Sequence, residues 1–412
     1  MTPSSKPAAR YVALFLLSSC GTPAFTNMQL GPLQPWAAPI TDAVLAGNAR
    51  FPSGFRRGIT TLRPHAGRLW IGYGDATANL GGVTPIEFRW FASAHDPTAR
   101  SAVVLGQGQG APQRNASDTG EEQIGHYRIC DGALCQPGVD SVNADEAWTQ
   151  ARDPARRIEG NFFRLEERAG APVWRKYRSV PGGEHVHDLA QFDGAVYAVG
   201  SGADIRAEFE TGQVFRYLWK STDGGASFQT VQRFLVPEAG KYDTRFRRLL
   251  PVGDTLFVFG YVNPYVDGGP RRGESMLLRG GTLRALTGPL ADAVVEQTYR
   301  LSQDLGLAIA RGAGGGTRTF AVQSRRRGEL RRWNRRRIVD VTRLPNDNGF
   351  FLLSGDRGQP ERFAVHHFYA GDPEALAWIL DCEGEAPTAL AWFDGALFVG
   401  TSGGRVLRAE RH

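Results

Sequence analysis

Residues 187–202, HDLAQFDGAVYAVGSG, contain the pattern that decides the fold. An apolar run ends at an Asp-Gly pair, and a second, alternating apolar run follows directly. Asp-Gly is a strong signal for a two-residue β-hairpin, because both turn residues must take φ > 0. The stretch therefore predicts the innermost strand of a sheet, a tight turn and the second strand of the same sheet.

The same turn-and-strand pattern recurs through the chain at intervals of roughly 45 to 65 residues, and a four-stranded propeller blade takes roughly 40–50 residues. Short turns leave no room for the crossover helices of a parallel sheet, and a pair of β-sandwiches does not predict one motif throughout. We therefore expect an all-β fold, a single β-propeller of seven four-stranded blades, with six or eight as alternatives. The copies are Ala66–Tyr73, Asp131–Pro137, Asp193–Gly200, Gly253–Gly260 and Asp394–Gly400, with weaker ones at Leu305–Ala310 and Asn348–Leu353.

Composition agrees with a turn-rich globular protein. The 412 residues are 42% hydrophobic and 22% charged and include 51 glycines, well above the usual glycine share of about 7%. Apolar runs extend through most of the chain, which argues against low-complexity disorder.

The N-terminus predicts export. Lys6 and Arg10 precede a short apolar run, which is too short to span a bilayer but fits a secretory signal. The following Leu17-Ser-Ser-Cys20 resembles the lipobox of bacterial lipoproteins, which implies lipidation of Cys20, and Gly21 favours the outer membrane. We expect a signal peptide over 1–19, the lipidated cysteine and a tether over 20–49, and the propeller over 50–412. An ordinary cleaved signal is the alternative.

Residues 221–228, STDGGASF, match the Asp-box pattern at every defined position. This octapeptide resembles the neuraminidase repeat of sialidase-like propellers, where the box forms a turn between the outer strands of a blade. In that turn the Asp223 carboxylate accepts backbone hydrogen bonds, Gly225 allows φ > 0, and Phe228 is buried. We interpret Ser221 and these three residues as structural.

A catalytic sialidase is disfavoured. By resemblance it requires an arginine triad, a Tyr/Glu nucleophile pair and an aspartate acid/base. Tyr127-Arg-Ile-Cys130 resembles the motif of the first arginine, with its proline replaced, but it runs straight into an Asp-Gly turn. We interpret it as an ordinary strand; the sequence contains one complete box, and no triad can be picked out.

The propeller geometry predicts where a ligand site would lie. Positions six residues before the turn glycine belong to the start of each innermost strand, and these converge at one mouth of the central channel. Such residues could bind a small polar ligand or glycan, or a metal through His and Asp; the alternative is a solvated channel with satisfied polar groups. The candidates at this offset are Thr61, His126 and Asp188, and Arg248 matches if Asp254 takes the place of the glycine. His185 and His187 flank Asp188 and could add to the site.

Two further sets of residues are weaker candidates. Asp75 and Asp140 follow their strands at the same offset and could cradle a calcium ion, although such residues more often cap their own turns. Cys130 and Cys135 flank a short loop and could form a disulfide in an exported compartment. We expect no other cofactor.

The segment 325–337 carries a net charge of +7, whereas the rest of the chain after Cys20 sums to −3. This patch predicts contact with phosphates, and a tethered protein would meet anionic lipid or lipopolysaccharide sooner than nucleic acid. The alternative is a solvated outer hairpin. The candidates are Arg325, Arg326, Arg327, Arg331, Arg332, Trp333, Arg335, Arg336 and Arg337.

Together these features favour an envelope lipoprotein, a monomer, whose propeller acts as a ligand-binding or scaffold module. A carbohydrate-active hydrolase or lyase with its site at the channel mouth is the alternative, and a protein partner on the outer blade faces is a third reading.

Overall fold

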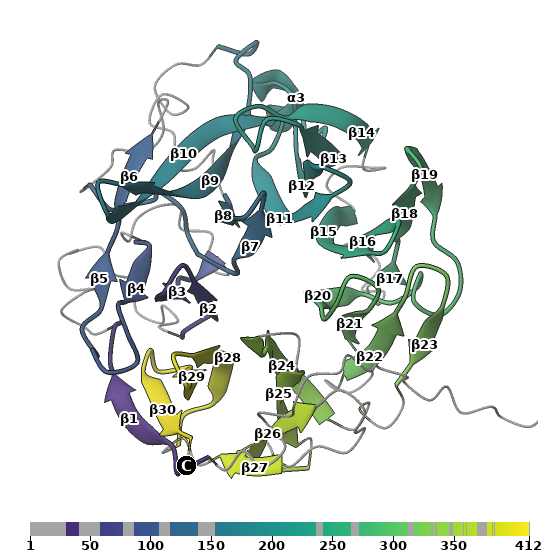
Figure 1. Cartoon of the computed structure of the whole chain (residues 1–412). Helices are drawn as coiled ribbons and strands as arrows, with labels where there is room; N and C mark the ends of the chain where they lie inside the picture. Colours follow the sequence, from purple (N-terminus) through teal and green to yellow (C-terminus); the bar gives the residue numbers. More distant parts are fainter. Residues whose placement is uncertain are drawn as a thin grey trace, which may run out of the picture.

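The chain is a seven-bladed β-propeller, seen along its axis in Figure 1. The computed structural model describes residues 30–40, 58–76, 86–106, 116–138, 153–235, 242–264, 272–311, 317–330, 333, 336–345, 349–356, 358–359, 361–368, 377–380, 382 and 384–411. Neighbouring strands within a blade are antiparallel, except at one added edge strand in the second blade. The expectation of seven blades is confirmed.

Each blade starts with an inner strand at the axis and proceeds outward. The first blade contains β2 (Thr61–His65), β3 (Arg68–Gly72), β4 (Arg89–Phe91) and β5 (Arg100–Ser101). The second contains β7 (Arg128–Cys130), β8 (Ala133–Pro137), β9 (Glu159–Arg168) and β10 (Ala171–Pro181), with β6 (Val103–Gly106) added in parallel at its outer edge. The third contains β11 (His185–Phe192), β12 (Ala195–Gly202), β13 (Phe215–Ser221) and β14 (Gln229–Leu235), with a short helix, α3 (Arg206–Glu210), before β13.

The remaining blades follow the same order. The fourth contains β15 (Tyr242–Val252), β16 (Thr255–Pro264), β18 (Met276–Arg279) and β19 (Thr282–Ala285), with β17 (Arg272–Gly273) paired to β16. The fifth contains β20 (Val295–Arg300), β21 (Gly306–Arg311), β22 (Thr317–Val322) and β23 (Arg327–Glu329). The sixth contains β24 (Arg336–Arg343), β25 (Phe350–Asp356), β26 (Phe363–Phe368) and β27 (Ala377–Leu380). The seventh contains β28 (Pro387–Phe393), β29 (Ala396–Thr401) and β30 (Val406–Glu410), completed by β1 (Gln34–Ala37).

The recurring sequence motif corresponds to one place in every blade. Each of its seven copies contributes to the second strand, and the turn before it joins the inner strand to that second strand. In the third blade Asp193 and Gly194 have φ of 49° and 72°, as a two-residue hairpin requires. The strand and turn interpretation of 187–202 is confirmed.

The ring closes between the two ends of the chain. β1 pairs antiparallel with β30, so a segment from before the first blade supplies the outermost strand of the seventh blade. The Trp36 ring lies 4.4 Å from the Phe91 ring and 4.8 Å from the Phe398 ring. The expectation of a tether through residue 49 is therefore wrong for β1, because its backbone is paired and its tryptophan packs between two blades. Residues 1–29 and 41–49, including Cys20, lie outside the described part.

Apolar side chains fill the spaces between blades. The Phe88 and Trp174 rings stack at 3.9 Å, and Trp70 meets Trp174 edge-on at 5.4 Å. This packing fixes the inner strands around the axis, where the polar residues of interest gather. No helix among the described residues is long and apolar enough to span a membrane.

Candidate ligand-binding channel

The inner strands of five consecutive blades carry a β-bulge at the same level of the channel. The bulged residues are His187, Arg247, Glu296, Val339 and Thr388 in β11, β15, β20, β24 and β28. A bulge kinks its strand and redirects side chains, and bulges are common beside functional sites. The residue after each bulge is thereby placed at an equivalent position beside the next blade.

Asp188 follows the first of these bulges and is fully buried. Its Oδ1 accepts from His126 Nε2 at 2.9 Å, from Arg128 Nε at 2.7 Å and from its neighbour's N–H at 2.8 Å. Its Oδ2 accepts from Arg128 Nη2 and from the Leu249 N–H of the next blade, both at 2.9 Å. Burial acts to raise the pKa of Asp188, but Arg128 and His126 outweigh it and hold that pKa well below its usual range. This carboxylate is saturated with donors and joins three blades; it is not poised as a general base.

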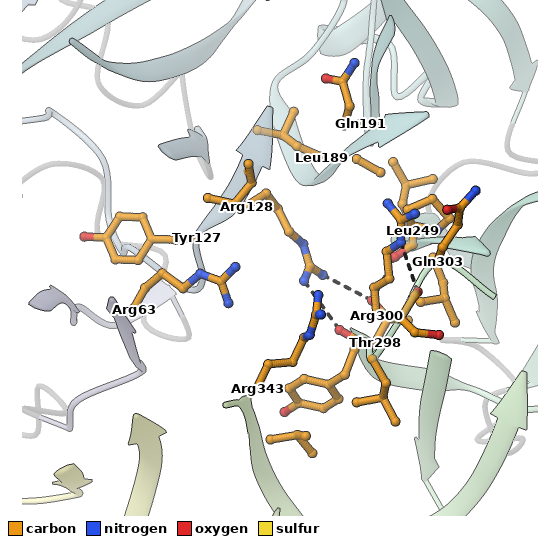
Figure 2. A pocket seen from close by; sticks show the side chains of 18 residues that line it. Arg63, Tyr127, Arg128, Leu189, Gln191, Leu249, Thr298, Arg300, Gln303 and Arg343 are labelled. Atoms are coloured by element: carbon orange, nitrogen blue, oxygen red, sulfur yellow. Dashed lines mark hydrogen bonds between the residues drawn. The ribbon is translucent and has the colours of Figure 1, made fainter. Parts of the chain in front are cut away.

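Arg128 crosses the channel. From β7 of the second blade it reaches β20 of the fifth blade, where Thr298 accepts at its Oγ1 (3.1 Å) and its carbonyl (3.4 Å). Figure 2 shows this side chain extended toward Thr298. Partial burial acts to lower the pKa of Arg128, but Asp188 raises it overall. Partial burial lowers the pKa of His126 to about 4 despite Asp188, so His126 is neutral near pH 7 and donates from Nε2.

Asp340 in the sixth blade is the counterpart of Asp188 without a paired cation. Its carboxylate accepts the N–H groups of Val341 and of Leu390 in the next blade, both at 2.8 Å. Tyr299 also hydrogen-bonds to it. Desolvation raises the pKa of Asp340 to about 6, and those three hydrogen bonds only partly oppose the shift. Burial and the nearby Asp340 raise the pKa of Tyr299 well above its usual range.

The channel widens on one side of this level into a cavity of about 540 Å³, which we call the histidine chamber. His185 and His187 stack with ring centroids 5.7 Å apart. Burial, followed by Arg245 nearby, holds the pKa of His187 well below its usual range. The chamber is lined by His126, His185, His187, Arg245, Arg247, Arg248, Glu122, Glu184 and uncharged neighbours.

The other side opens into a cavity of about 470 Å³, the arginine chamber. Arg63, Arg128, Arg300 and Arg343 come from four different blades and extend into this space in Figure 2. No acidic residue is among its described lining residues. Neutral polar groups complete it: Gln191, Thr298, Tyr299, Ser302 and Gln303.

The described lining residues of the arginine chamber carry a net positive charge. Burial, with the adjacent Arg128 and Arg343, lowers the pKa of Arg63 to about 10. Arg63 Nε is buried with no hydrogen-bond partner among the described residues. Burial and Arg300 also lower the pKa of Arg343. Because neighbouring guanidinium groups lower the pKa values of Arg63 and Arg343, an anion bound between them would stabilise their charged forms.

A narrower waist of about 130 Å³ lies between the chambers and shares lining residues with both. Thr61 and Asp340 lie here, together with His126, Arg128 and Arg248. Arg248 donates to the Glu296 carbonyl at 2.7 Å and to its neighbour's carbonyl at 2.9 Å. Burial and Arg247 lower the pKa of Arg248 to about 10.

The structure brings the sequence candidates together as a group but gives them different roles. His126, His185, His187 and Arg248 line the histidine chamber, and Thr61 lines the waist. Asp188 contacts His126 but is buried behind the wall.

Sequence reasoning missed the arginine chamber. Arg128 belongs to the Tyr127-Arg-Ile-Cys130 stretch, for which the sequence predicts an ordinary strand. The residue does lie on strand β7. The strand is not ordinary, however, because the Arg128 side chain spans the channel. Arg300 and Arg343 each lie six residues before the glycine of a weaker motif copy, and Arg63 and Arg128 each lie four residues before the turn glycine of theirs. These shared offsets are a sequence signal, but only the fold shows that the two pairs line one cavity.

The Asp box forms the turn between β13 and β14. Asp223 Oδ1 accepts from Ser221 Oγ at 2.7 Å and the Ser227 N–H at 2.9 Å, and Ser221 Oγ accepts the Gly225 N–H at 2.8 Å. Burial acts to raise the pKa of Asp223, but the Ser227 and Ser221 hydrogen bonds lower it to about 2. The Phe228 ring is buried and meets Phe162 edge-on at 5.5 Å. Ser221, Asp223, Gly225 and Phe228 thus take part in the hydrogen bonds and packing of this turn.

The disulfide prediction is wrong in this structure. Cys130 and Cys135 are both buried free thiols. In the β7–β8 ladder Cys130 pairs with Ala133 and Cys135 pairs with Arg128, so the cysteines are diagonal rather than opposite neighbours. The two thiols hydrogen-bond to each other across this diagonal, and no covalent bond joins them.

The calcium prediction involves Asp75, which is buried, and Asp140, which lies outside the described residues. Within the part of the chain that the structure describes, no group of three or more His, Cys, Asp or Glu side chains could hold a metal ion.

The arginine-rich segment connects two blades and is not one hairpin. It runs from the outermost strand of the fifth blade, β23, to the inner strand of the sixth, β24. Trp333 packs against His366 and Phe368 at 5.1 and 5.4 Å, so its ring faces the protein. Arg336 Nη1 contacts His366 Nε2 at 2.9 Å, and the Arg337 guanidinium lies 5.5 Å from the Phe363 ring. Arg325, Arg326 and Arg327 are exposed, whereas Arg331, Arg332 and Arg335 lie outside the described residues.

Comparison with known proteins finds only remote likenesses, to propellers of varied activity. No family model and no curated protein match it. A virginiamycin B lyase from Staphylococcus aureus is 8% identical with a TM-score of 0.47, covering 93% of this chain and 99% of that one. The Dos1 propeller is 13% identical with a TM-score of 0.47, covering 92% and 95%. A Hadza microbial sialidase is 12% identical with a TM-score of 0.43, covering 79% and 73%. These values are low, so the fold rests on the sheet topology of this chain and its function on the geometry of this channel.

Proposed function

We propose that the propeller is a binding module for a small, hydroxyl-bearing anion, held in the arginine chamber by a carboxylate. An acidic sugar is a molecule of this class. The observation that carries the proposal is the convergence of Arg63, Arg128, Arg300 and Arg343 on one cavity whose described lining residues include no acid. Of these, Arg128 is paired with Asp188.

The chemistry of the wall favours a carboxylate joined to hydroxyl groups. A guanidinium binds a carboxylate in a bidentate way, with stronger hydrogen bonds than neutral pairs make. Gln191, Gln303 and Ser302 offer neutral donors and acceptors on the same wall. The volume of about 470 Å³ falls in the usual range for small-ligand sites.

A carbohydrate-active hydrolase or lyase is the second candidate. The observation that favours it is the Tyr299–Asp340 pair at the waist, next to the arginine chamber. A carboxyl with a pKa of about 6 can hold or release a proton near neutral pH. The high pKa of Tyr299 opposes its deprotonation, so we place binding first.

The cellular setting belongs to the proposal as well. The lipobox-like sequence at Cys20 would anchor the protein in the cell envelope, with the outer membrane favoured. The exposed Arg325, Arg326 and Arg327 would then face anionic lipid or lipopolysaccharide. Calorimetry of vesicles with and without anionic lipid, on wild type and on a triple serine variant, would test this contact.

The arginine chamber is tested by calorimetric titration of glucuronate, with glucose as the neutral analogue. We expect glucuronate to bind and glucose not to bind. Arg63→Ser and Arg343→Ser should each lower the affinity for glucuronate by about tenfold or more, as expected for lost charge-assisted hydrogen bonds. Arg284→Ser on the exposed strand β19 is the matched control and should leave affinity unchanged.

Equal binding of the acid and the neutral sugar, or an unchanged affinity in both channel variants, would refute the proposal. The enzyme candidate is checked in the same samples by following products of acidic oligosaccharides with chromatography. Turnover that disappears in Asp340→Asn, while glucuronate binding persists, would move the assignment from binding module to enzyme.

A further inference from the structure

The histidine chamber is a separate concentration of positive charge at the other side of the waist. Its wall includes Arg247 and Arg248 from β15 and His187 from β11. Two acidic residues, Glu122 and Glu184, also line it, and Glu184 Oε2 lies 3.5 Å from His185 Nδ1. The basic groups are thus concentrated on the fourth blade and on the adjacent edge of the third.

Two of these groups lie at β-bulges. His187 and Arg247 are the bulged residues of neighbouring inner strands, so the same kind of backbone irregularity sets the direction of both side chains. His187 Nε2 is buried, lines the chamber wall and has no hydrogen-bond partner among the described residues. A buried polar atom normally has a partner, and an oxyanion in the chamber would supply one.

The two chambers are divided by a braced crossbar. Arg128 spans the channel to Thr298 and is held in place by Asp188, which also binds His126. The basic groups proposed to hold an anion in the histidine chamber come from β11 and β15, whereas the arginines of the arginine chamber come from β2, β7, β20 and β24. The binding events are expected to be separable by mutation.

We propose that the histidine chamber is a second anion site, which holds a small tetrahedral oxyanion against Arg247, Arg248 and the Nε2 of His187. This goes beyond the carboxylate site of the arginine chamber and does not depend on it. The oxyanion has the chemistry of sulfate or phosphate, free or as an ester on a larger molecule.

Binding at this site is coupled to proton uptake. His187 is neutral in the free protein, because burial and the surrounding arginines hold its pKa well below its usual range. A bound dianion offsets those arginines, raises the pKa of His187 and favours its charged form. Lower pH should then strengthen binding. The groups that face His187 from the elements around it are His185 and Glu184 on or beside β11, Arg245, Arg247 and Arg248 on β15, and His126 and Glu122 across the chamber.

Sulfate is the probe, because its charge stays constant near neutral pH. Calorimetric titrations use wild type, Arg343→Ser to disable the arginine chamber, and Arg247→Ser to disable the histidine chamber. We expect Arg343→Ser to retain a sulfate site that tightens by about tenfold between about pH 7.5 and about pH 5.5. Arg247→Ser should lose that site. Titrations in buffers with different ionisation enthalpies should show proton uptake.

Two more variants separate the chemistry from any folding defect. Arg247→Lys keeps the charge and should retain most of the affinity, and His187→Gln should bind sulfate without the pH dependence. A ligand with a phosphate ester, glucose 6-phosphate, compared with inorganic phosphate, distinguishes an esterified from a free oxyanion. Loss of all sulfate binding in Arg343→Ser, or an identical pH dependence in His187→Gln, would overturn the proposal.

Discussion

Asp188 and Asp340 perform the same structural task three blades apart. Each follows a bulge on its inner strand, and each accepts the N–H of the next residue and the N–H of a leucine in the following blade. Asp188 is also paired with Arg128, whereas no cation is within salt-bridge distance of Asp340 among the described residues. Their opposite pKa shifts follow from this one difference.

Removing the charge of Asp188 should destabilise the propeller strongly. Asp188→Asn leaves the Arg128 guanidinium in the channel without its carboxylate and turns an amide toward backbone donors. Breaking a buried ion pair in this way costs about 3–5 kcal/mol in unfolding free energy. Urea unfolding of wild type and variant measures this loss in unfolding free energy. Asp193→Asn, at the exposed turn of the same blade where φ is 49°, is the control and should be near neutral, since Asn also suits that turn. Equal stability of the two variants would contradict the role of Asp188 in joining three blades.

Asp340 should make the protein less stable as pH rises from about 4 to about 6. Its folded pKa of about 6 lies above the unfolded value, so the folded state binds the proton more tightly in this interval. The resulting stability is present below the unfolded pKa and is lost as pH rises through the folded one. The loss is at most about 2 kcal/mol, because the residue is only partly buried.

Urea midpoints at a series of pH values measure this dependence. Asp340→Asn should flatten the curve between about pH 4 and about pH 6. Asp188 stabilises the folded state throughout this interval and alters the pH dependence only at lower pH, where its stabilisation is lost, since its folded pKa is depressed. A wild-type curve that rises over the interval would show that Asp340 ionises normally.

Gly225 should not tolerate a side chain. Its φ is 99°, and a Cβ there would lie 2.0 Å from Phe162 Cε1. Gly225→Ala combines backbone strain with a clash against a buried ring, so we expect a loss of about 2–4 kcal/mol. Gly67→Ala is the matched control, since φ is 70° there but nothing lies within 4 Å; strain alone should cost about 1 kcal/mol. Thermal unfolding compares the two, and glucuronate affinity should survive in both.

Trp36 should hold the ring closed. Trp36→Ala removes a partly buried indole that contacts Phe91 in the first blade and Phe398 in the seventh. We expect about 2–3 kcal/mol lower stability, less than for a fully buried tryptophan. Gln34→Ala on the same strand is exposed and serves as control. A chain that starts after β1 should be less stable still, and limited proteolysis should cut its seventh blade first. Unchanged proteolysis would show that β1 is dispensable for closure.

The architecture was accessible from the sequence because it depends on local chemistry. The Asp-Gly pair before Ala195 needs positive φ at both turn residues, and the same pair of positive φ values occurs in the first, second and seventh blades. The Asp box around Asp223 is likewise made of residues within hydrogen-bond reach along the chain. Aligning blades on the turn glycine also led to His126 and Asp188, which do meet at 2.9 Å.

The role of each side chain was not accessible in this way. Asp188 connects three blades because its donors come from two other blades. The register of one hairpin makes Cys130 and Cys135 diagonal neighbours rather than opposite ones. The β1 strand looked like tether because its partner, β30, lies at the far end of the chain.

By itself the sequence determined the repeated hairpins, and with them the propeller, since turn conformation and strand alternation are properties of neighbouring residues. The tertiary structure alone decided which side chains share a cavity. Arg63, Arg128, Arg300 and Arg343 are spread over 281 positions and meet because ring closure brings inner strands together around one axis. The lowering of the pKa of Arg63 by Arg128 and Arg343 is a property of that shared, partly desolvated space, which no stretch of sequence contains.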